Sequence, residues 1–110
     1  MNLTEWKSQV KRGVLEYIIL MLIQSREYYG YEIIATLKQY ESLSAKESTI
    51  YPLLKRLEKE QYLESIWKDV SDGLPPRKYY QITKEGKKLI KEMKPYMAEI
   101  FTVIKELEGE

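Results

Sequence analysis

Residues 44–62 constrain the fold most, because their apolar side chains recur with the period of a helix. Four of them stand at positions i, i+3, i+4 and i+7 and therefore share one helix face: Ile50, Leu53, Leu54 and Leu57. Ser44 followed by Glu47 matches a capping box, in which each side chain satisfies a backbone N–H of the first turn. The pattern predicts a helix that begins at Ala45 and packs one face on a core.

The opposite face of this helix carries small hydroxyls, a tyrosine and cations. In chain order they are Ser48, Thr49, Tyr51, Pro52, Lys55, Arg56 and Lys59. Such residues read base edges and bind phosphates, but they also suit an ordinary solvated helix face. Pro52 removes one backbone hydrogen bond and costs about 3 kcal/mol inside a helix. We therefore expect the helix to bend there or to begin nearer Ser48.

Length and charge limit the class of protein. A chain of 110 residues makes one domain with a modest core, which a dimer would enlarge. The formal net charge is only +1, so any nucleic-acid surface must be local. Cations dominate residues 77–94 and carboxylates dominate residues 95–110. The charge is thus polarised along the chain.

The sequence contains neither cysteine nor histidine. This excludes disulfides, thiol and imidazole nucleophiles and the usual zinc sites. No cluster of acidic residues suggests the carboxylate pair of a glycosidase. We expect no catalytic residue, no metal and no cofactor, and hence a protein that is not an enzyme.

The N-terminal segment is expected to form a helix over residues 4–24, capped by Thr4. Its apolar run, residues 14–23, follows three cations as a signal peptide would, but Glu16 interrupts it and no small-residue cleavage site follows. The run is also too short to span a bilayer, which needs about 20 residues. We therefore expect a soluble, cytoplasmic protein, with Trp6 and Val10 available for contact with a partner.

The middle of the chain predicts a helix-turn-helix followed by a β-hairpin. A turn over residues 27–30 leads to a short helix, residues 31–40, and residues 41–43 connect it to the amphipathic helix. Residues 62–68 and 77–82 then show strand patterning around a loop with Gly73 and two prolines. The alternation leaves open which side of the hairpin is buried. The fold class is mainly α with a small β-hairpin, in which residues 1–82 form a winged helix.

The last helix is expected to begin after Thr83 as its cap, with Glu85 in the first turn and a kink at Pro95. Its apolar residues alternate in steps of three and four, as in a coiled coil: Ile90, Met93, Met97, Ile100, Ile104 and Leu107. This seam predicts that residues 83–110 pair with a second copy of the chain, together with Trp6 and Val10. The alternative is that the last helix folds back on the first helix of the same chain. The two arrangements can also occur together.

Three segments in this order resemble the PadR family of transcriptional regulators over nearly the whole chain. They are Tyr29-Gly30-Tyr31-Glu32-Ile33, Ser48-Thr49-Ile50-Tyr51-Pro52-Leu53-Leu54-Lys55-Arg56-Leu57-Glu58 and Pro76-Arg77-Lys78-Tyr79-Tyr80-Gln81-Ile82-Thr83-Lys84-Glu85-Gly86. A single C-terminal helix resembles the compact branch of the family. The resemblance implies a homodimeric repressor that binds a pseudo-palindromic DNA operator and responds to a small aromatic or hydrophobic effector.

The resemblance also implies roles for individual residues. Those expected in the major groove are Ser48, Thr49, Tyr51, Pro52 and Lys55. Those expected on phosphates or in the minor groove are Tyr31, Lys46, Arg56, Arg77 and Lys78. An effector would contact Trp6, Met93, Tyr96, Met97 and Phe101. The sequence departs from the family at the hairpin tip, where residues 74–76 replace glycine and arginine, and in the last helix, which has no tryptophan.

A second hypothesis is a winged-helix adaptor that binds a protein in place of DNA. Its motivation is the nearly neutral net charge.

Overall fold

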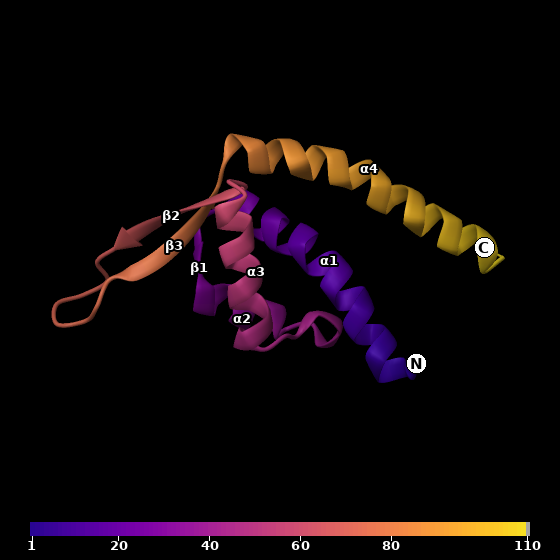
Figure 1. Ribbon diagram of the computed structural model, residues 1–110, viewed down its shortest axis with the longest axis horizontal. Coiled ribbons are helices and arrows are strands. Elements are labelled where there is room, and N and C mark those ends of the chain that lie inside the picture. Colours follow the sequence, from indigo (N-terminus) through magenta and orange to yellow (C-terminus); the bar gives the residue numbers. More distant parts are fainter. Residues whose placement is uncertain (110) are drawn as a thin grey trace.

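A three-stranded sheet lies at one end of a group of helices, and a long C-terminal helix leaves that group (Figure 1). The computed structural model describes residues 1–109. Its elements are α1 Leu3–Ser25, β1 Tyr28–Tyr29, α2 Gly30–Leu37, the 3₁₀-helix η1 Glu41–Leu43, α3 Glu47–Lys59, β2 Leu63–Lys68, β3 Arg77–Ile82 and α4 Lys84–Leu107. The predicted order of helix-turn-helix, hairpin and long last helix is confirmed. Among these residues no helix is long and apolar enough to cross a membrane.

The core is built from one face of each helix and from the base of the sheet. Its fully buried side chains are Leu15, Ile19, Leu20, Ile23, Ile33, Leu37, Ile50, Leu54, Leu57 and Leu63. The predicted stripe of α3 is therefore confirmed, with Leu53 only half-buried at its margin. No polar side chain is buried among the described residues. Apolar packing alone thus decides which face of α3 is turned outward.

The sheet has the order β1-β3-β2, so the hairpin gains a third strand. Tyr28 pairs with Tyr80 and Tyr29 with Tyr79, in a segment expected to be only a turn. That expectation was wrong because the pairing partner lies some fifty residues away, where local turn signals carry no information. Tyrosine favours such half-buried strand positions.

The hairpin of β2 and β3 with its loop, residues 63–82, is called the wing below. Leu63 pairs with Ile82, and the register continues to Lys68 opposite Arg77. Leu63 is fully buried, so its side of β2 faces the core. This resolves which side of the hairpin is covered. Beyond its base the wing projects away from the helices (Figure 1).

The observed bounds of α1 and α2 differ from the predicted ones. α1 begins one residue early, because the Asn2 side chain and not Thr4 caps it by accepting a hydrogen bond from the Glu5 backbone N–H at 2.9 Å. α2 begins at Gly30 and ends at Leu37. The residues after Leu37 form tight turns and η1, so the connection to α3 is longer than expected.

The capping box at Ser44 is not formed, and α3 begins at Glu47 with Lys46 as the N-cap residue. The Lys11 ammonium donates a hydrogen bond to the Ser44 carbonyl at 2.6 Å, which ties this segment to α1. A sequence pattern cannot show such a long-range contact. The later start agrees with the alternative of a beginning nearer Ser48, and α3 continues unbroken through Pro52.

α4 begins as expected, with the Thr83 hydroxyl accepting from the Gly86 N–H at 2.9 Å. It runs unbroken through Pro95 and curves gently where a kink was expected (Figure 1). Its first half packs on the core through Leu89, Ile90 and Met93. Its second half extends beyond the core, and the chain reaches 58 Å along its longest axis. The helix therefore packs on the rest of the chain and also leaves apolar surface open.

Gly86 is the tightest point where α4 joins the sheet. A Cβ atom there would lie 2.3 Å from the Tyr62 carbonyl oxygen, which is backbone, and 2.6 Å from an Ile82 methyl. We expect Gly86→Ala to lower the free energy of unfolding by about 1–3 kcal/mol, as overpacking does. The control is Gly13→Ala, because Gly13 is an exposed residue of α1 where an added Cβ would meet nothing within 4 Å. It should stabilise by about 0.5–1 kcal/mol. Urea titrations measure both, and equal effects would contradict the packing.

Candidate nucleic-acid interface

The outward face of α3 presents the residues that the sequence singled out. Ser48, Pro52 and Lys55 are exposed, and Thr49 is half-buried beside them. The pyrrolidine of Pro52 leaves the Ser48 carbonyl without its helical partner on this exposed face. The face therefore offers hydroxyl groups, a free carbonyl and a cation to a ligand.

Tyr51 joins α3 to the start of α2. Its ring lies so close to Gly30 that a Cβ there would come within 2.5 Å of it. The side chain keeps 41% of its surface exposed. Burial, followed by the nearby Glu47 and Tyr80, raises the pKa of Tyr51. The phenol thus stays neutral and can both donate and accept hydrogen bonds. Tyr31, which follows Gly30, is more exposed still.

A shallow hollow of about 450 Å³ lies between α1 and the N-terminus of α3. Among its lining residues are the cations Lys11, Arg12 and Lys46, with Thr49 at the edge of the α3 face. Of these three cations, the sequence analysis selected Lys46 alone, together with Thr49. It missed Arg12, because only the packing of α1 brings that side chain to the start of α3.

The outer half of the wing strands, beside β1, carries a cluster of aromatic and charged side chains. The Arg77 guanidinium lies 4.5 Å from the centre of the Tyr29 ring. That ring meets Tyr79 edge to face with centroids 5.4 Å apart. Lys68 forms an ion pair with Glu27 and lies over the Tyr79 ring. Arg77 is exposed and has no carboxylate partner among the described residues, so it is held in place and open to a phosphate.

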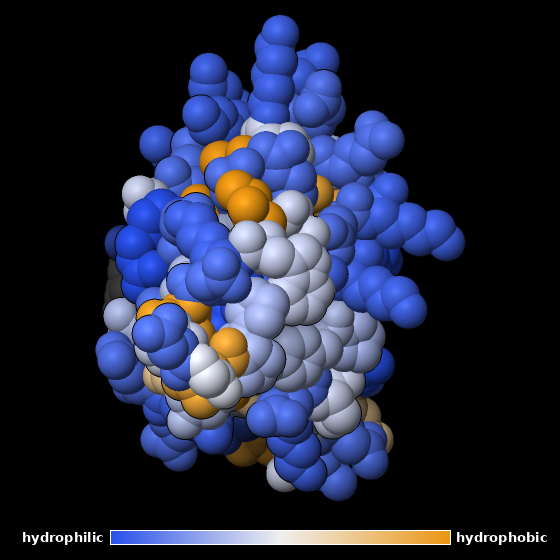
Figure 2. Space-filling model, turned by 90° about the vertical axis from the view of Figure 1, so that its left-hand side faces the viewer, coloured by the Kyte–Doolittle hydropathy of each residue, from blue (hydrophilic) through white to orange (hydrophobic). Residues whose placement is uncertain are grey.

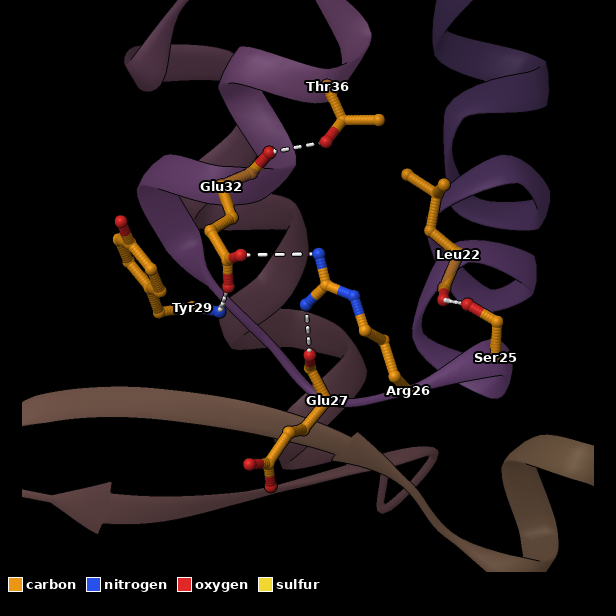
Figure 3. Close-up of polar contacts among 7 residues, drawn as sticks. All are labelled: Leu22, Ser25, Arg26, Glu27, Tyr29, Glu32 and Thr36. Carbon is orange, nitrogen blue, oxygen red and sulfur yellow. Dashed lines mark hydrogen bonds and ion pairs between the residues drawn. The ribbon is translucent and has the colours of Figure 1, made fainter.

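Figure 3 shows the polar junction that places Tyr29 and the start of α2. The Glu32 carboxylate accepts from the Tyr29 backbone N–H at 3.1 Å and from Arg26 at 3.2 Å. Arg26 also donates to the Glu27 carbonyl at 2.7 Å. One carboxylate thus satisfies the first turn of α2 and fixes the β1 strand that supports Arg77.

Two of the residues expected on phosphates, Lys78 and Arg56, form ion pairs with carboxylates of the same chain. The Lys78 ammonium donates to Glu58 of α3 at 3.0 Å, and the Ser65 hydroxyl of β2 donates to the other oxygen of the same carboxylate. Arg56 forms an ion pair with Glu16 of α1. Glu58 therefore fastens both strands of the wing to α3, and Lys78 is a positioning residue in this arrangement.

The face seen from the wing side is mostly hydrophilic, with a band of residues of intermediate hydropathy through its middle (Figure 2). Few strongly apolar residues interrupt it. This combination suits a polar ligand such as DNA better than an apolar protein partner.

The residues expected at a dimer seam or in contact with an effector fall into two groups. Ile90 is 6% exposed and Met93 half-buried, and both pack on the core of the chain itself. The others on the second half of α4 lie open, together with residues of α1: Trp6, Val10, Tyr96, Ile100, Phe101, Ile104 and Leu107 are exposed, and Met97 is half-buried. The structure therefore leaves an apolar stripe on α4 only beyond Met93.

Comparison with known proteins identifies the family. The model of the transcriptional regulator PadR-like family matches residues 19–92. The chain belongs to the PadR-like family. An uncharacterized protein from Lysinibacillus sphaericus is 41% identical over 100 residues, which cover 89% of this chain and 91% of that protein. PadR-like proteins are DNA-binding transcription regulators, not enzymes, and membership favours DNA over the adaptor hypothesis.

Solved structures agree with this assignment. The PadR-like regulator from Bacillus cereus is 36% identical with a TM-score of 0.82, over 93% of this chain and 98% of that chain. Bacillus subtilis PadR in complex with operator DNA is 34% identical with a TM-score of 0.64, over 73% of this chain and 45% of that chain. The chain thus matches the Bacillus cereus regulator over almost its whole length.

The Glu58 contacts predict a pH-dependent contribution to stability. Partial burial alone would raise the pKa of Glu58, but the hydrogen bonds from Ser65 and Lys78 outweigh it and lower the pKa. A lowered carboxylate pKa stabilises the fold above the usual glutamate range, and this is lost as pH falls through the lowered value. We expect Glu58→Gln to reduce stability by up to about 1 kcal/mol at neutral pH, with no difference from the parent protein in acid.

Thermal melts of both proteins across this pH range measure the effect. Glu60→Gln serves as the control, because that exposed carboxylate lies 4.0 Å from Arg56 and should matter little at any pH. A melting temperature of Glu58→Gln equal to the parent at neutral pH would show that the carboxylate does not hold the wing.

Proposed function

We propose that this PadR-like protein is a homodimeric repressor that places α3 in the major groove of a pseudo-palindromic operator. The observation that carries the proposal is the outward face of α3, where hydroxyls, Tyr51 and Lys55 stand beside the wing. The complex of Bacillus subtilis PadR with operator DNA supports it by similarity. Such a regulator acts where the chromosome is, in the cytoplasm.

The proposal assigns residues by their surroundings. Ser48, Thr49, Tyr51, Pro52 and Lys55 read the groove. Tyr31, Lys46 and Arg77 bind phosphates, because each is exposed and Lys46 and Arg77 are cations. Arg56 and Lys78 act indirectly, since both are paired with carboxylates.

Dimerisation would use the exposed stripe of α4, so residues 83–110 serve as the dimerisation helix. Two copies of α3 must reach half-sites about 34 Å apart, one helical turn of DNA. Burial of apolar surface between two copies would also stabilise a chain whose own core is small. The exposed Ile100, Ile104 and Leu107 supply the apolar surface for this contact.

A small aromatic or hydrophobic effector would bind at the same seam. Tyr96 and Phe101 expose aromatic rings on α4, and Trp6 does so on α1. Pairing of two subunits would bring these rings around a shared apolar space. An effector there would change the spacing of the two α3 helices and so the affinity for DNA.

Replacement of the exposed cations tests DNA binding. We expect Lys55→Ala and Arg77→Ala each to weaken binding and to lower the slope of log affinity against log salt by about 1, because one phosphate contact is lost. Lys105→Ala is the control, since it removes the same charge near the far end of α4. Fluorescence anisotropy with labelled operator duplex at several salt concentrations measures all three. Unchanged slopes in both variants would contradict the proposed surface.

A charge on the apolar stripe tests dimerisation. Ile104→Lys should yield monomers at micromolar concentration, because pairing would bury the ammonium group without a partner. Thr102→Lys lies about 200° around the helix and should leave the dimer intact. Light scattering after size-exclusion chromatography distinguishes the two, and a dimeric Ile104→Lys would refute this interface.

A further inference from the structure

Trp67 is a large aromatic side chain that has no role in the interface described so far. It lies near the outer end of β2 and is 64% exposed. The loop beyond it carries Leu74, Pro75 and Pro76, which are exposed as well. The loop of the wing therefore exposes apolar side chains and no cation.

The contacts of its neighbours show which way Trp67 faces. Alternate residues of a strand share one side, so Trp67 lies on the side of Ser65. It stands opposite Lys78 in the sheet register. Ser65 and Lys78 both donate to Glu58 of α3. Trp67 thus lies on the side of the wing that faces α3, about 7 Å further along the strand than Ser65.

This position borders the DNA-reading face. Glu58 lies one helical turn after Lys55, which is exposed on that face. The Glu58 contacts hold the wing against α3 just inside Trp67. In the proposed complex, a DNA strand that leaves the groove occupied by α3 and passes the wing would meet the Trp67 ring.

The loop of the wing, residues 69–76, offers no cation to a phosphate. Its charged residues are Asp69 and Asp72, which are exposed. Carboxylates would be repelled from a narrow minor groove lined by phosphates. A favourable contact of this loop with DNA therefore has to come from its uncharged groups, which adjoin Trp67.

We infer that Trp67 packs its indole ring on the sugar–phosphate backbone of the operator, between the major groove read by α3 and the adjacent minor groove. The ring covers the apolar face of a deoxyribose, and its N–H can donate to a phosphate oxygen. The inference rests on the proposed function and adds a contact of a different kind. A neutral side chain releases no counterion, so its contribution to affinity is independent of salt.

The test compares Trp67→Ala and Trp67→Phe with the parent protein on an operator duplex of about 20 base pairs. We expect Trp67→Ala to bind about tenfold more weakly at every salt concentration, the size of a lost aromatic contact, with an unchanged salt slope. Trp67→Phe keeps most of the apolar ring and should recover most of the affinity. Because Trp67 is exposed, both variants should melt as the parent does.

A second readout is indole fluorescence, because the chain has one other tryptophan, Trp6. Saturating operator DNA should change the fluorescence of the parent protein and reduce its quenching by acrylamide, and the part of both effects that is missing in Trp67→Phe belongs to Trp67. Parental affinity of Trp67→Ala, a lowered salt slope of Trp67→Ala, or equal effects of DNA on the fluorescence of the parent and of Trp67→Phe would each overturn the inference. Failure of the parent protein to bind any duplex would instead refute the proposed function, and the inference with it.

Discussion

Burial of one face of α3 is the constraint on which the rest of the structure depends. Ile50, Leu54 and Leu57 are each no more than 1% exposed, and they pack among apolar residues of the other helices and of β2. Because no polar side chain is buried among residues 1–109, this packing alone fixes the rotation of α3 about its axis. The side chains of Ser48, Thr49 and Lys55 lie on the opposite face of α3 and therefore point away from the core. Their outward orientation is thus a consequence of the core packing.

Two carboxylates, Glu32 and Glu58, fix the positions of elements that the apolar core does not hold by itself. Glu32 holds the start of α2 and the β1 strand, and through Tyr29 it supports Arg77. Glu58 fastens both strands of the wing to α3. These links join α2, α3 and the wing, the elements that we propose face DNA, into one unit of fixed shape. A regulator that must match the pitch of a duplex benefits from such rigidity, because less order must be imposed on binding.

The sequence predicted the elements that follow from local periodicity and turn residues. It did not predict features that depend on contacts between residues far apart in the chain. The α3 stripe, the Thr83 cap and both wing strands follow from local patterns and are confirmed. The β1 strand and the start of α3 depend on Tyr80 and Lys11, far away in the chain. For the same reason the sequence does not show that Lys78, which is expected on phosphates, pairs with Glu58 of another element. The sequence did not single out Trp67 as a binding residue, because no sequence pattern shows that one aromatic side chain of a strand is exposed.

Methylation protection of guanine N7 tests the central claim most directly, because that atom lies in the major groove. The protein bound to DNA selected from a random pool should protect guanines in two half-sites whose centres lie about 10 base pairs apart. Such protection would place the outward face of α3 in two successive major grooves. Bound DNA without N7 protection, or protection confined to a single site, would contradict the account.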